Sequence, residues 1–425
     1  MTRNHFTRSL LAAGAALTLT NGVRRAAADP RRPVILVVSS WQSVNIGDVA
    51  HTPGLLCALE KHLPDAEVIL WGLSVDEEKA AMLTRRWPDL QIVRGNLDDE
   101  GRASGEALQA AIDRADLLLH GSGPSFVAFT RVRAWHRATG KPFGLFGVTL
   151  QAPNAEQVAL LNEAAFIFTR ETHSIEHLRE RGVKRPEIGF APDATFAMDL
   201  KNDDAAEAFL SHTGLIDKPF ICCIPRLRYT PYHLIRRVPW SEEEIARREA
   251  VNAEHAEPDH AKMRAAMIRW VRETGQPILV CPEMTYQLDV MDELLVAPLP
   301  EDVRAHVVQR DSFWLPDEAA SVYAQARAVL SFECHSPIIS LHQGIPSCYL
   351  RQPEDTIKGQ MYYDLDLSDW VFEIEDTEGA QVADRLMEIE ADHAAATAKV
   401  TAALAIVDRQ YRTATGFIGR RLAAG

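Results

Sequence analysis

The sequence predicts two doubly wound α/β domains, in which helices cover both faces of a mainly parallel sheet. Short apolar runs alternate with helical stretches along most of the 425 residues, and this alternation is typical of βαβ units. A polar, acidic stretch at residues 201–217 interrupts the alternation, which restarts at Pro219. Because a chain of this length with 47% hydrophobic residues can bury more than one core, we place the domain boundary at that stretch.

The first 28 residues have the features of a signal peptide. Two arginines precede a short apolar run at residues 10–19, and three alanines at residues 26–28 form a small-residue cleavage site. The run is too short to span a bilayer as a stable anchor. We therefore expect a cleaved leader and a periplasmic or secreted protein without a stable membrane span. A disordered tail on a cytoplasmic protein is the alternative, because Arg24 and Arg25 beside the cleavage site are atypical.

Four segments are expected along the chain: the leader at residues 1–28, an N-terminal domain at 29–200, a C-terminal domain at 201–376 and an alanine-rich helical region at 377–425. The formal charge of −14 argues against nucleic acid as a partner, because phosphate binding by bulk electrostatics needs an excess of Lys and Arg. The six cysteines lack the paired spacing of a zinc site, so we interpret them as mainly buried thiols.

The first strand of the N-terminal domain leads into a loop with the layout of a ligand-binding site. Residues 33–39 (PVILVVS) form a buried strand, and residues 53–62 (PGLLCALEKH) form the helix that follows the loop SWQSVNIGD. Gly47 permits a close approach of the backbone, while Asn45 and Asp48 offer short polar side chains at the helix entry. We expect all three residues to contribute to a site.

Two later loops of this domain supply further candidates. The strand ADLLLH ends in Gly121, Ser122 and Gly123, which fit a tight turn against a ligand, although a plain loop is an equal alternative. Arg170 follows the strand FIFT, and Asp193 lies in a tight turn before the chain leaves the domain. Asp193 has a second interpretation, in which its side chain only caps that turn.

The stretch at residues 331–358 carries the densest group of candidate residues. An apolar strand (ARAVLSF) delivers Glu333, His335 and Ser336 to its carboxyl end, and a short helix and a second strand (IPSCYL) follow. Open α/β sheets bind ligands beyond the carboxyl ends of their strands, so we expect a site here. The alternative is an ordinary βαβ unit in which His335 only caps a helix.

The C-terminal domain opens with the strand PFICCIP, which is followed directly by Arg226. Residues 231–258 are long, polar and irregular in pattern, and we interpret them as a lid or a disordered insertion. His255, Asp259 and His260 have a spacing that could share a metal ion on one helix face, but their charged neighbours indicate a solvated surface. We therefore predict no metal site.

Five motifs fall in one order along the chain. They are NIGD from Asn45, HGSGPS from His120, FTRETHS from Phe168, APDATF from Ala191, and CHSPIISLHQGIPSCYL from Cys334 with Lys358 downstream. This order resembles the polysaccharide pyruvyltransferase family over most of residues 34–370. The resemblance implies two Rossmann-like domains facing each other across a cleft, in a GT-B-like arrangement. It also implies phosphoenolpyruvate as the donor of a pyruvyl ketal to a sugar diol of a polysaccharide or glycan, here in a divergent, exported member.

The candidate residues suit that reaction. The enol must be protonated at its methylene carbon, a sugar hydroxyl attacks the resulting oxocarbenium ion, and phosphate leaves before a second hydroxyl closes the ketal. An imidazole is a good proton donor near neutral pH, so His335 is the candidate acid. Asp48 or Asp193 would orient or deprotonate the acceptor hydroxyls. Beyond phosphoenolpyruvate as a co-substrate we expect no cofactor, because cationic side chains can supply the charge that a metal would supply.

The donor's carboxylate and phosphate need such cations, and Lys358 with Arg226 or Arg170 would hold them. One position departs from the family pattern, which usually places an arginine two residues before the histidine, where this chain has Glu333. An acid there would repel a small anionic donor unless another cation compensates. The departure leaves two alternatives: a sugar or nucleotide-sugar transferase in which Glu333 accepts hydrogen bonds from hydroxyls, and an exported carbohydrate-binding protein without catalysis. The sequence predicts no oligomeric state.

Overall fold

A computed structural model describes residues 31–98 and 100–424 of the chain, and a single compact unit runs from Pro33 to Gly425. The expected leader lies outside the described residues and stays a prediction. Among the helices at residues 31–98 and 100–424, none combines the length and the hydrophobicity that a membrane crossing needs. All six cysteines are buried and unpaired, which confirms their interpretation as buried thiols.

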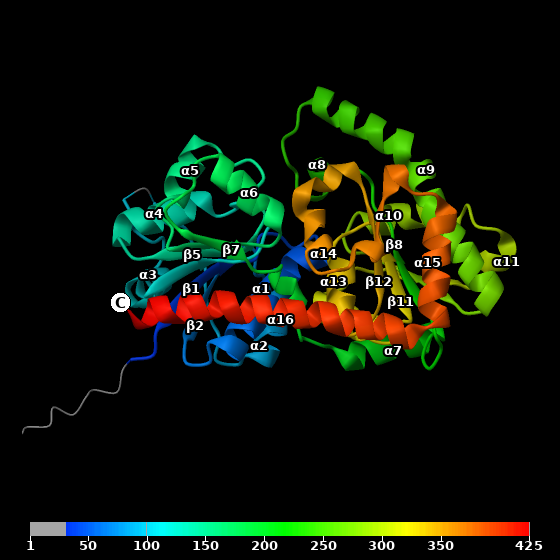
Figure 1. Ribbon diagram of the computed structural model, residues 1–425, viewed down its shortest axis with the longest axis horizontal. Helices are drawn as coiled ribbons and strands as arrows, with labels where there is room; N and C mark the ends of the chain where they lie inside the picture. The colour runs from blue at the N-terminus through cyan, green and yellow to red at the C-terminus, as the bar shows by residue number, and fades with distance from the viewer. Residues whose placement is uncertain (1–30, 99, 425) are drawn as a thin grey trace, which may run out of the picture. The chain divides into compact units, whose positions relative to one another are not determined.

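The first sheet has seven parallel strands in the order β3-β2-β1-β4-β5-β6-β7. It lies on the left of Figure 1, where β1, β2, β5 and β7 are labelled. Its three central strands, β1 (Val34–Ser39), β4 (Leu117–His120) and β5 (Phe143–Val148), consist entirely of buried residues, as a parallel sheet covered by helices on both faces requires. The strand order reverses between β1 and β4, so the carboxyl ends of these two strands mark a topological switch point. The outer strands are β2 (Glu67–Gly72), β3 (Gln91–Val93), β6 (Phe166–Thr169) and β7 (Glu187–Phe190).

Helix α1 (Ile46–His62) connects β1 to β2 and begins earlier than the predicted start at residue 53. The side chain of Asn45 caps it by accepting hydrogen bonds from the backbone N–H groups of Gly47 and Asp48. Pro53, the predicted first helical residue, lies inside the helix instead. The other helices of the first half are α2 (Glu77–Arg86), α3 (Glu106–Arg114), α4 (Phe129–Thr139), α5 (Ala155–Leu161), α6 (Thr172–Glu180) and the 3-10 turn η1 (Ala194–Ala197).

The second sheet has six parallel strands in the order β10-β9-β8-β11-β12-β13. Its switch point lies between β8 (Ile221–Ile224) and β11 (Ala328–Ser331), which are also made of buried residues. Two doubly wound parallel sheets confirm the predicted fold class. The remaining elements are α7 (Asp203–Thr213), β9 (Ile278–Val280), α10 (Gln287–Met291), the π-helical turn η2 (Asp292–Val296), α11 (Glu301–Arg304), β10 (Val307–Gln309), α12 (Pro316–Tyr323), α13 (His335–His342), β12 (Ser347–Arg351), η3 (Pro353–Gly359), α14 (Gln360–Tyr363), η4 (Ser368–Trp370), β13 (Val371–Glu373) and η5 (Ile374–Asp376).

The interpretation of residues 231–258 as an irregular insertion is wrong. The segment forms the short helix α8 (Tyr232–Ile235) and the first half of the long helix α9 (Glu242–Thr274). Ser241 caps α9, and the run of Glu, Ala and Arg residues behind it favours a helix. Pro258 lies inside α9, where it removes one backbone hydrogen bond. Packing against α15 and η2 holds the helix together despite that loss.

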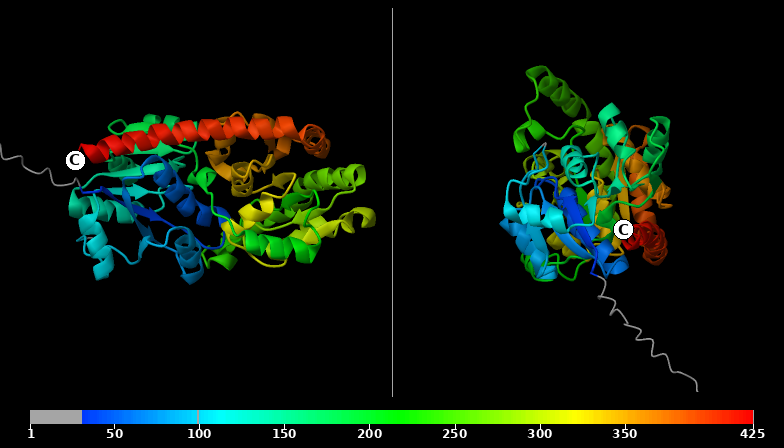
Figure 2. Two further views of the ribbon diagram at one scale, coloured as in Figure 1. Left: turned by 90° about the horizontal axis from the view of Figure 1, so that it is seen from below. Right: turned by 90° about the vertical axis from the view of Figure 1, so that its left-hand side faces the viewer.

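The C-terminal region forms the helices α15 (Gly379–Ala391) and α16 (His393–Ala423), which meet at Asp392. Helix α15 packs on α9, whereas α16 contacts α13 of the second half and α1 and β7 of the first half. The views in Figure 2 show α16 as one continuous helix along both sheets. It therefore fastens the two halves to each other.

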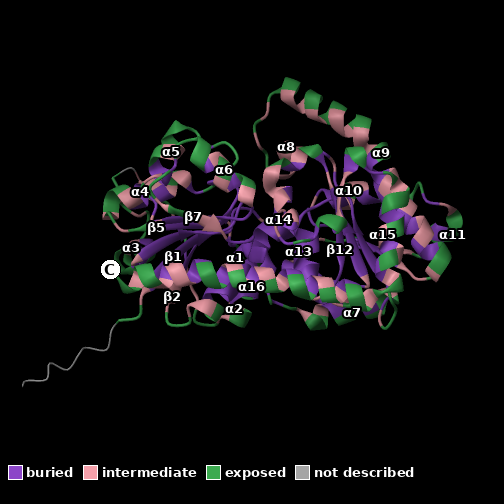
Figure 3. Cartoon of the chain, viewed as in Figure 1, coloured by how far each residue is buried: buried purple, intermediate pink, exposed green. Residues whose placement is uncertain are grey.

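One hydrophobic core continues from the first half into the second. Ile35 and Val37 of β1 belong to the same buried cluster as Ile221 and Leu330 of the second sheet, while Leu36 faces a separate cluster on the other face of β1. Figure 3 shows that the buried residues run through both sheets and into the region between them. The loops at the carboxyl ends of the strands are thus held in fixed positions by a shared core.

Candidate active site

The loops at the carboxyl ends of β1 and β9 bind to each other directly. Ile46 N donates to Glu283 O at 2.9 Å, and Thr285 N donates to Val44 O at 3.0 Å. Asn45 and Met284 form an isolated antiparallel bridge between the same loops. Residues that follow strands in both sheets are therefore brought into one buried site.

Four buried side chains form the centre of this site. The imidazole of His335 lies with Nδ1 3.2 Å from Glu283 Oε1 and with Nε2 3.2 Å from His51 Nε2. Asp193 Oδ2 lies 3.3 Å from His51 Nε2 and 3.9 Å from His335 Nε2. His51, Asp193 and Glu283 are fully buried, and His335 is 7% exposed. We call these four residues the central cluster.

The backbone of Gly47 lies against the imidazole of His335. A Cβ atom on residue 47 would come within 2.1 Å of His335 Cγ, a separation that no side chain could tolerate. Asn45 Oδ1 accepts a hydrogen bond from Gly47 N at 2.6 Å and from Asp48 N at 3.2 Å. The backbone at Gly47, held by Asn45, therefore limits where the imidazole of His335 can lie.

Glu283 holds both His335 and the start of helix α13. Its Oε2 atom accepts hydrogen bonds from Ser336 N at 2.6 Å and Ser336 Oγ at 2.8 Å. Burial alone would raise the pKa of Glu283, but the imidazole of His335 and the donors of Ser336 lower it. For His335 the directions are reversed. Burial would lower the pKa of its imidazole, but contact with Cys334 and the hydrogen bond with Glu283 raise that pKa well above its ordinary value. Glu283 therefore holds His335 in place and favours its protonated form.

Asp193 caps its turn, as one prediction had it, and also belongs to the central cluster. Its Oδ1 atom accepts from Thr195 N at 2.9 Å, and its Oδ2 atom accepts from Arg170 Nη1 at 2.7 Å. Burial would raise the pKa of Asp193, but His51 and Arg170 bring it well below its usual range. Arg170 is itself buried and donates from Nε to Thr149 Oγ1 at 2.7 Å. Its charge therefore neutralises Asp193 and is not available to hold an anionic donor.

Asp48 lies at the edge of the central cluster. Its Oδ2 atom accepts a hydrogen bond from Gln42 Nε2, and its Oδ1 atom lies 3.8 Å from His51 Nδ1. The side chain of Tyr232, on α8, is half-buried and lies near Gln42 and Asp48. Burial first, and then the carboxylate of Asp48, raises the pKa of Tyr232. Tyr232 therefore places helix α8 beside the site.

A second group of charged residues lies beside the central cluster. Arg226 binds Asp355 directly, and its Nε atom lies 3.4 Å from Glu333 Oε1. Lys358 Nζ lies 3.1 Å from Asp355 Oδ1, and Gln287 Nε2 donates to Glu333 Oε1 at 3.0 Å. Burial raises the pKa of Glu333 to about 7, against the opposing effect of Arg226. Two cations thus face two carboxyl groups, one of which titrates near neutral pH.

The glycine turn after β4 contacts the protein on several sides. Ser122 Oγ accepts from Ala194 N at 2.9 Å and donates to Phe146 O at 3.3 Å. A Cβ atom on Gly121 would come within 3.0 Å of Ser39 Oγ, and one on Gly123 within 2.8 Å of the Trp41 ring nitrogen. This turn therefore packs against the end of β1, the loop that follows it and the turn that carries Asp193.

His51, Asp193 and His335 have donor atoms within 4.8 Å of one another, a spacing that a metal ion could use. The guanidinium of Arg170 already binds Asp193 Oδ2, so its positive charge opposes a cation there. Two residues of the cluster His255, Asp259 and His260 are also buried: Asp259 and His260. Their predicted position on a solvated surface is therefore wrong. Asp259 pairs with Arg228, and His260 Nε2 accepts from Arg226 N.

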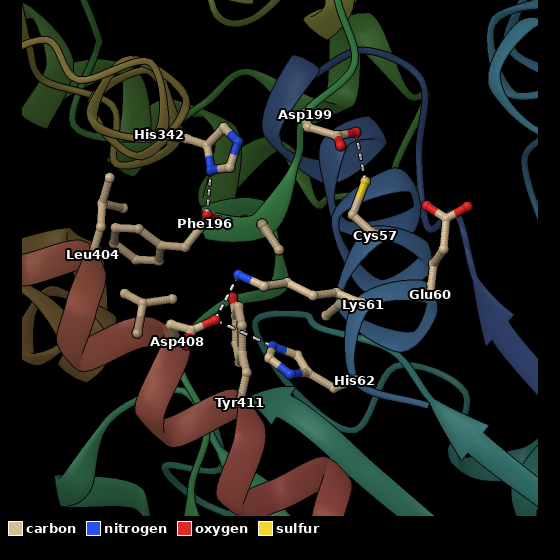
Figure 4. A pocket seen from close by; sticks show the side chains of 13 residues that line it. Cys57, Glu60, Lys61, His62, Phe196, Asp199, His342, Leu404, Asp408 and Tyr411 are labelled. Carbon is tan, nitrogen blue, oxygen red and sulfur yellow. Dashed lines mark hydrogen bonds and ion pairs between the residues drawn. The ribbon is translucent and has the colours of Figure 1, made fainter. Parts of the chain in front are cut away.

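A cavity of about 500 Å³ lies between α1, η1 and α16 (Figure 4). Three hydrogen bonds fix the turn that carries Asp193: Cys57 Sγ donates to Asp199 Oδ1, His342 Nδ1 bonds Phe196 O, and Tyr411 Oη donates to Asp193 O at 2.5 Å. None of the four residues of the central cluster lines the cavity. Helix α16 therefore contributes to the site indirectly, through the backbone of Asp193.

Sequence reasoning brought Asp48, Asp193 and His335 to one site but missed several of their partners. His51 lies within a helix that was predicted to begin after it, so no motif pointed to it. Glu283 follows strand β9, and this position at a strand end was the one signal that could have identified it.

A family model described as "Polysaccharide pyruvyl transferase" matches residues 45–352 of the chain. No curated protein matches the sequence. Among solved structures, S. aureus MnaA with UDP is similar at a TM-score of 0.53 and 12% identity, over 87% of this chain and 91% of that one. Anabaena Alr3699/HepE with UDP is similar at a TM-score of 0.54 and 12% identity, over 92% of this chain and 100% of that one. UDP-GlcNAc 2-epimerase from Neisseria meningitidis is similar at a TM-score of 0.52 and 10% identity, over 91% of this chain and 100% of that one. These likenesses support the two-domain, GT-B-type fold.

Proposed function

Because the chain belongs to the polysaccharide pyruvyl transferase family, we propose that it transfers a pyruvyl group from phosphoenolpyruvate to a sugar diol of a glycan. The observation that carries this proposal is the position of His335. Its Nδ1 atom is held by Glu283, while its Nε2 atom faces the junction of the two halves. A protonated imidazole fixed in this way suits the delivery of a proton to an enol carbon.

The carboxylates of the first half suit the acceptor side of the reaction. Asp193 is held ionised by Arg170 and lies 3.9 Å from His335 Nε2. Asp48 lies near Tyr232 of helix α8. We assign Asp193 to the stabilisation of the oxocarbenium ion, because its carboxylate lies 3.9 Å from Nε2 of His335, the proposed acid. We assign Asp48 to accepting the proton of the attacking hydroxyl group.

Arg226 and Lys358 are the cations available for the donor's carboxylate and phosphate. In the described structure both are paired with Asp355, and Arg226 also contacts Glu333. Since the pKa of Glu333 is about 7, a proton on this carboxyl would free part of the charge of Arg226. Donor binding would then be accompanied by protonation of Glu333.

The direct test measures phosphate release from phosphoenolpyruvate in the presence of candidate glycans, for the wild type and His335→Ala. The variant should lose turnover by roughly a hundredfold or more, because the proton donor is deleted, while donor binding suffers less. Equal turnover in the two proteins would contradict the assignment of His335.

A transferase with a neutral sugar donor is the second candidate, and the position of Glu333 favours it. Glu333→Arg should tighten phosphoenolpyruvate binding if the donor is anionic, because a repulsion is replaced by a cation. The same change should abolish ligand binding if Glu333 accepts hydrogen bonds from sugar hydroxyls. Calorimetry on both proteins separates the two functions. If neither protein binds phosphoenolpyruvate at millimolar concentration, the pyruvyl donor is wrong.

A further inference from the structure

We infer that Asp355 is a positioning residue that holds Arg226 and Lys358 together as one anion-binding site. This inference rests on the proposed function, because it names the residue that aligns these two cations for the donor's carboxylate and phosphate. It has a counterintuitive consequence, since a buried carboxylate that repels anions is then required to bind one. Asp355 lies in η3, just after strand β12 of the second sheet.

The protein binds both oxygens of the Asp355 carboxylate. The two cations share Oδ1: Arg226 Nη1 donates to it, and Lys358 Nζ lies 3.1 Å away. The other oxygen, Oδ2, accepts from Tyr349 Oη at 2.6 Å and from Gln352 N at 3.3 Å. The residue is 1% exposed. The fold therefore fixes Asp355 through Oδ2, and Asp355 fixes the cations through Oδ1.

The backbone beside Asp355 has an unusual conformation. Thr356 has φ 60° and ψ −167°, a combination that β-branched residues rarely adopt. Its carbonyl accepts a hydrogen bond from Arg351 Nη2 at 2.6 Å. A backbone of this kind persists only where the surrounding structure enforces it. The turn therefore sets the spacing between Asp355 and Lys358, which lies three positions later.

Arg226 has an unused donor on its other edge. Its Nη1 atom donates to Asp355 and, at 3.2 Å, to Gln352 Oε1. Its Nε atom is buried and has no hydrogen-bond partner in the part of the chain that the structure describes, although Glu333 Oε1 lies 3.4 Å from it. A buried donor without a partner calls for an explanation, and arginine binds carboxylate and phosphate through pairs of N–H groups. The Nε edge of Arg226 is therefore available to an anion.

The charges explain why the two cations need Asp355. Arg226 and Lys358 both contact one oxygen atom, so their positive charges lie close together and repel each other. Burial would raise the pKa of Asp355, but Arg226 and Lys358 lower it to about 2, and the carboxyl group is ionised at neutral pH. Its negative charge offsets the repulsion. Without that charge we expect the two cations to separate.

Two roles for Asp355 predict opposite results. If its carboxylate only competes with the donor for the cations, Asp355→Asn should tighten the binding of inorganic phosphate. If it positions the cations, the variant should bind phosphate and phosphoenolpyruvate roughly tenfold more weakly, and KM for phosphoenolpyruvate should rise with little change in kcat. Calorimetry measures the binding, and steady-state kinetics measure KM and kcat. Equal or tighter phosphate binding by Asp355→Asn would overturn the inference.

Two further variants control this comparison. Asp317→Asn also removes a buried carboxylate that pairs with an arginine, Arg85, outside the site, and it should bind phosphate as the wild type does. Lys358→Gln should abolish phosphate binding, which assigns the probe to this site. If phosphate still binds Lys358→Gln, or does not bind the wild type, no anion site lies between the two cations and the inference is wrong.

The outcomes separate this inference from the proposed function. If the wild type binds phosphate but not phosphoenolpyruvate, and Asp355→Asn binds phosphate weakly, the pyruvyl donor is wrong and the role of Asp355 stands. If Asp355→Asn turns over phosphoenolpyruvate with the wild-type KM, the function stands and the role of Asp355 is wrong.

A second variant serves if Asp355→Asn does not fold. Tyr349→Phe removes the hydroxyl group that binds Oδ2 of Asp355 and changes no charge. It should weaken phosphate binding several-fold, because Asp355 and the cations on it lose part of their support. Wild-type affinity in Tyr349→Phe would then overturn the inference.

Discussion

Gly47 and His335 are in direct contact across the junction of the two halves, and a Cβ atom on residue 47 would lie 2.1 Å from His335 Cγ. Alanine at position 47 must therefore displace the imidazole. We expect Gly47→Ala to lower the free energy of unfolding by about 1–3 kcal/mol, the usual cost of overpacking, and to reduce turnover more than donor binding. Chemical denaturation and steady-state kinetics check the two effects.

Gly416→Ala is the control for this change. Gly416 lies inside α16, where an added Cβ would meet only the end of the Arg420 side chain, at 3.6 Å. Alanine favours a helix over glycine by up to about 1 kcal/mol, so the control should be neutral or more stable. Equal stability of the Gly47→Ala variant and the wild type would show that the two loops separate easily.

Glu283 controls the proton of His335, and replacing it tests this directly. The bond with Glu283 helps to raise the pKa of His335, so the imidazolium persists to higher pH than it would alone. Glu283→Gln removes the negative charge and lowers the pKa of His335. The decline of kcat with rising pH should then begin at a lower pH, by about one unit or more. A pH profile of kcat measures the shift, and an unchanged alkaline limb would contradict the role of His335 as the acid.

Most of the fold could be predicted because apolar strands and their helices alternate regularly. The two larger errors both concern prolines. Pro53 and Pro258 lie inside α1 and α9, whereas the sequence pattern predicts the start of a helix at Pro53 and the end of an irregular segment at Pro258. In each case tertiary packing of the helix outweighs the lost hydrogen bond. A proline alone is therefore a weak marker of a helix boundary in a large protein.

The site was predicted only where a residue follows a strand. Asp48 and His335 lie in the first turns of helices that follow strands, and Asp193 directly precedes a 3-10 turn; the structure places all three in one buried region. His51 was missed because its partner in the site, His335, lies 284 positions away along the chain. The pairing of Glu333 with Arg226 was missed for the same reason. Local patterns find the loops of a site, but the partner of a charge is set by the packing of distant elements.

Tyr411 connects the C-terminal helix to the site. Its hydroxyl group donates to Asp193 O at 2.5 Å, and Tyr411→Phe leaves this buried carbonyl without that donor. We expect a loss of about 1–3 kcal/mol in the free energy of unfolding and a lower kcat, because the turn of Asp193 loosens. Tyr363→Phe, which removes a hydrogen bond to Glu373 outside the site, should lower stability without lowering kcat. Equal kcat values in the two variants would show that α16 has no influence on Asp193.

The last prediction concerns Glu333, whose pKa is raised by burial to about 7. A carboxyl group with a raised pKa favours its neutral form in the folded protein. Its contribution to stability is therefore present at low pH and is lost as the pH rises through 7. The same titration should govern an anionic donor, because protonation of Glu333 leaves the charge of Arg226 less compensated.

We expect phosphoenolpyruvate to bind the wild type several-fold more tightly at pH 6 than at pH 8, because repulsion by Glu333 is present only at the higher pH. Glu333→Gln should lose this dependence and keep only the change in affinity that the donor's own titration causes. The donor's own titration affects both proteins alike, so the comparison isolates Glu333, and Glu273→Gln on the surface of α9 should behave as the wild type does. Calorimetry at the two pH values measures the difference. If the wild type and Glu333→Gln respond to pH in the same way, Glu333 does not face the donor, and the cation site of Arg226 and Lys358 must be assigned to another ligand.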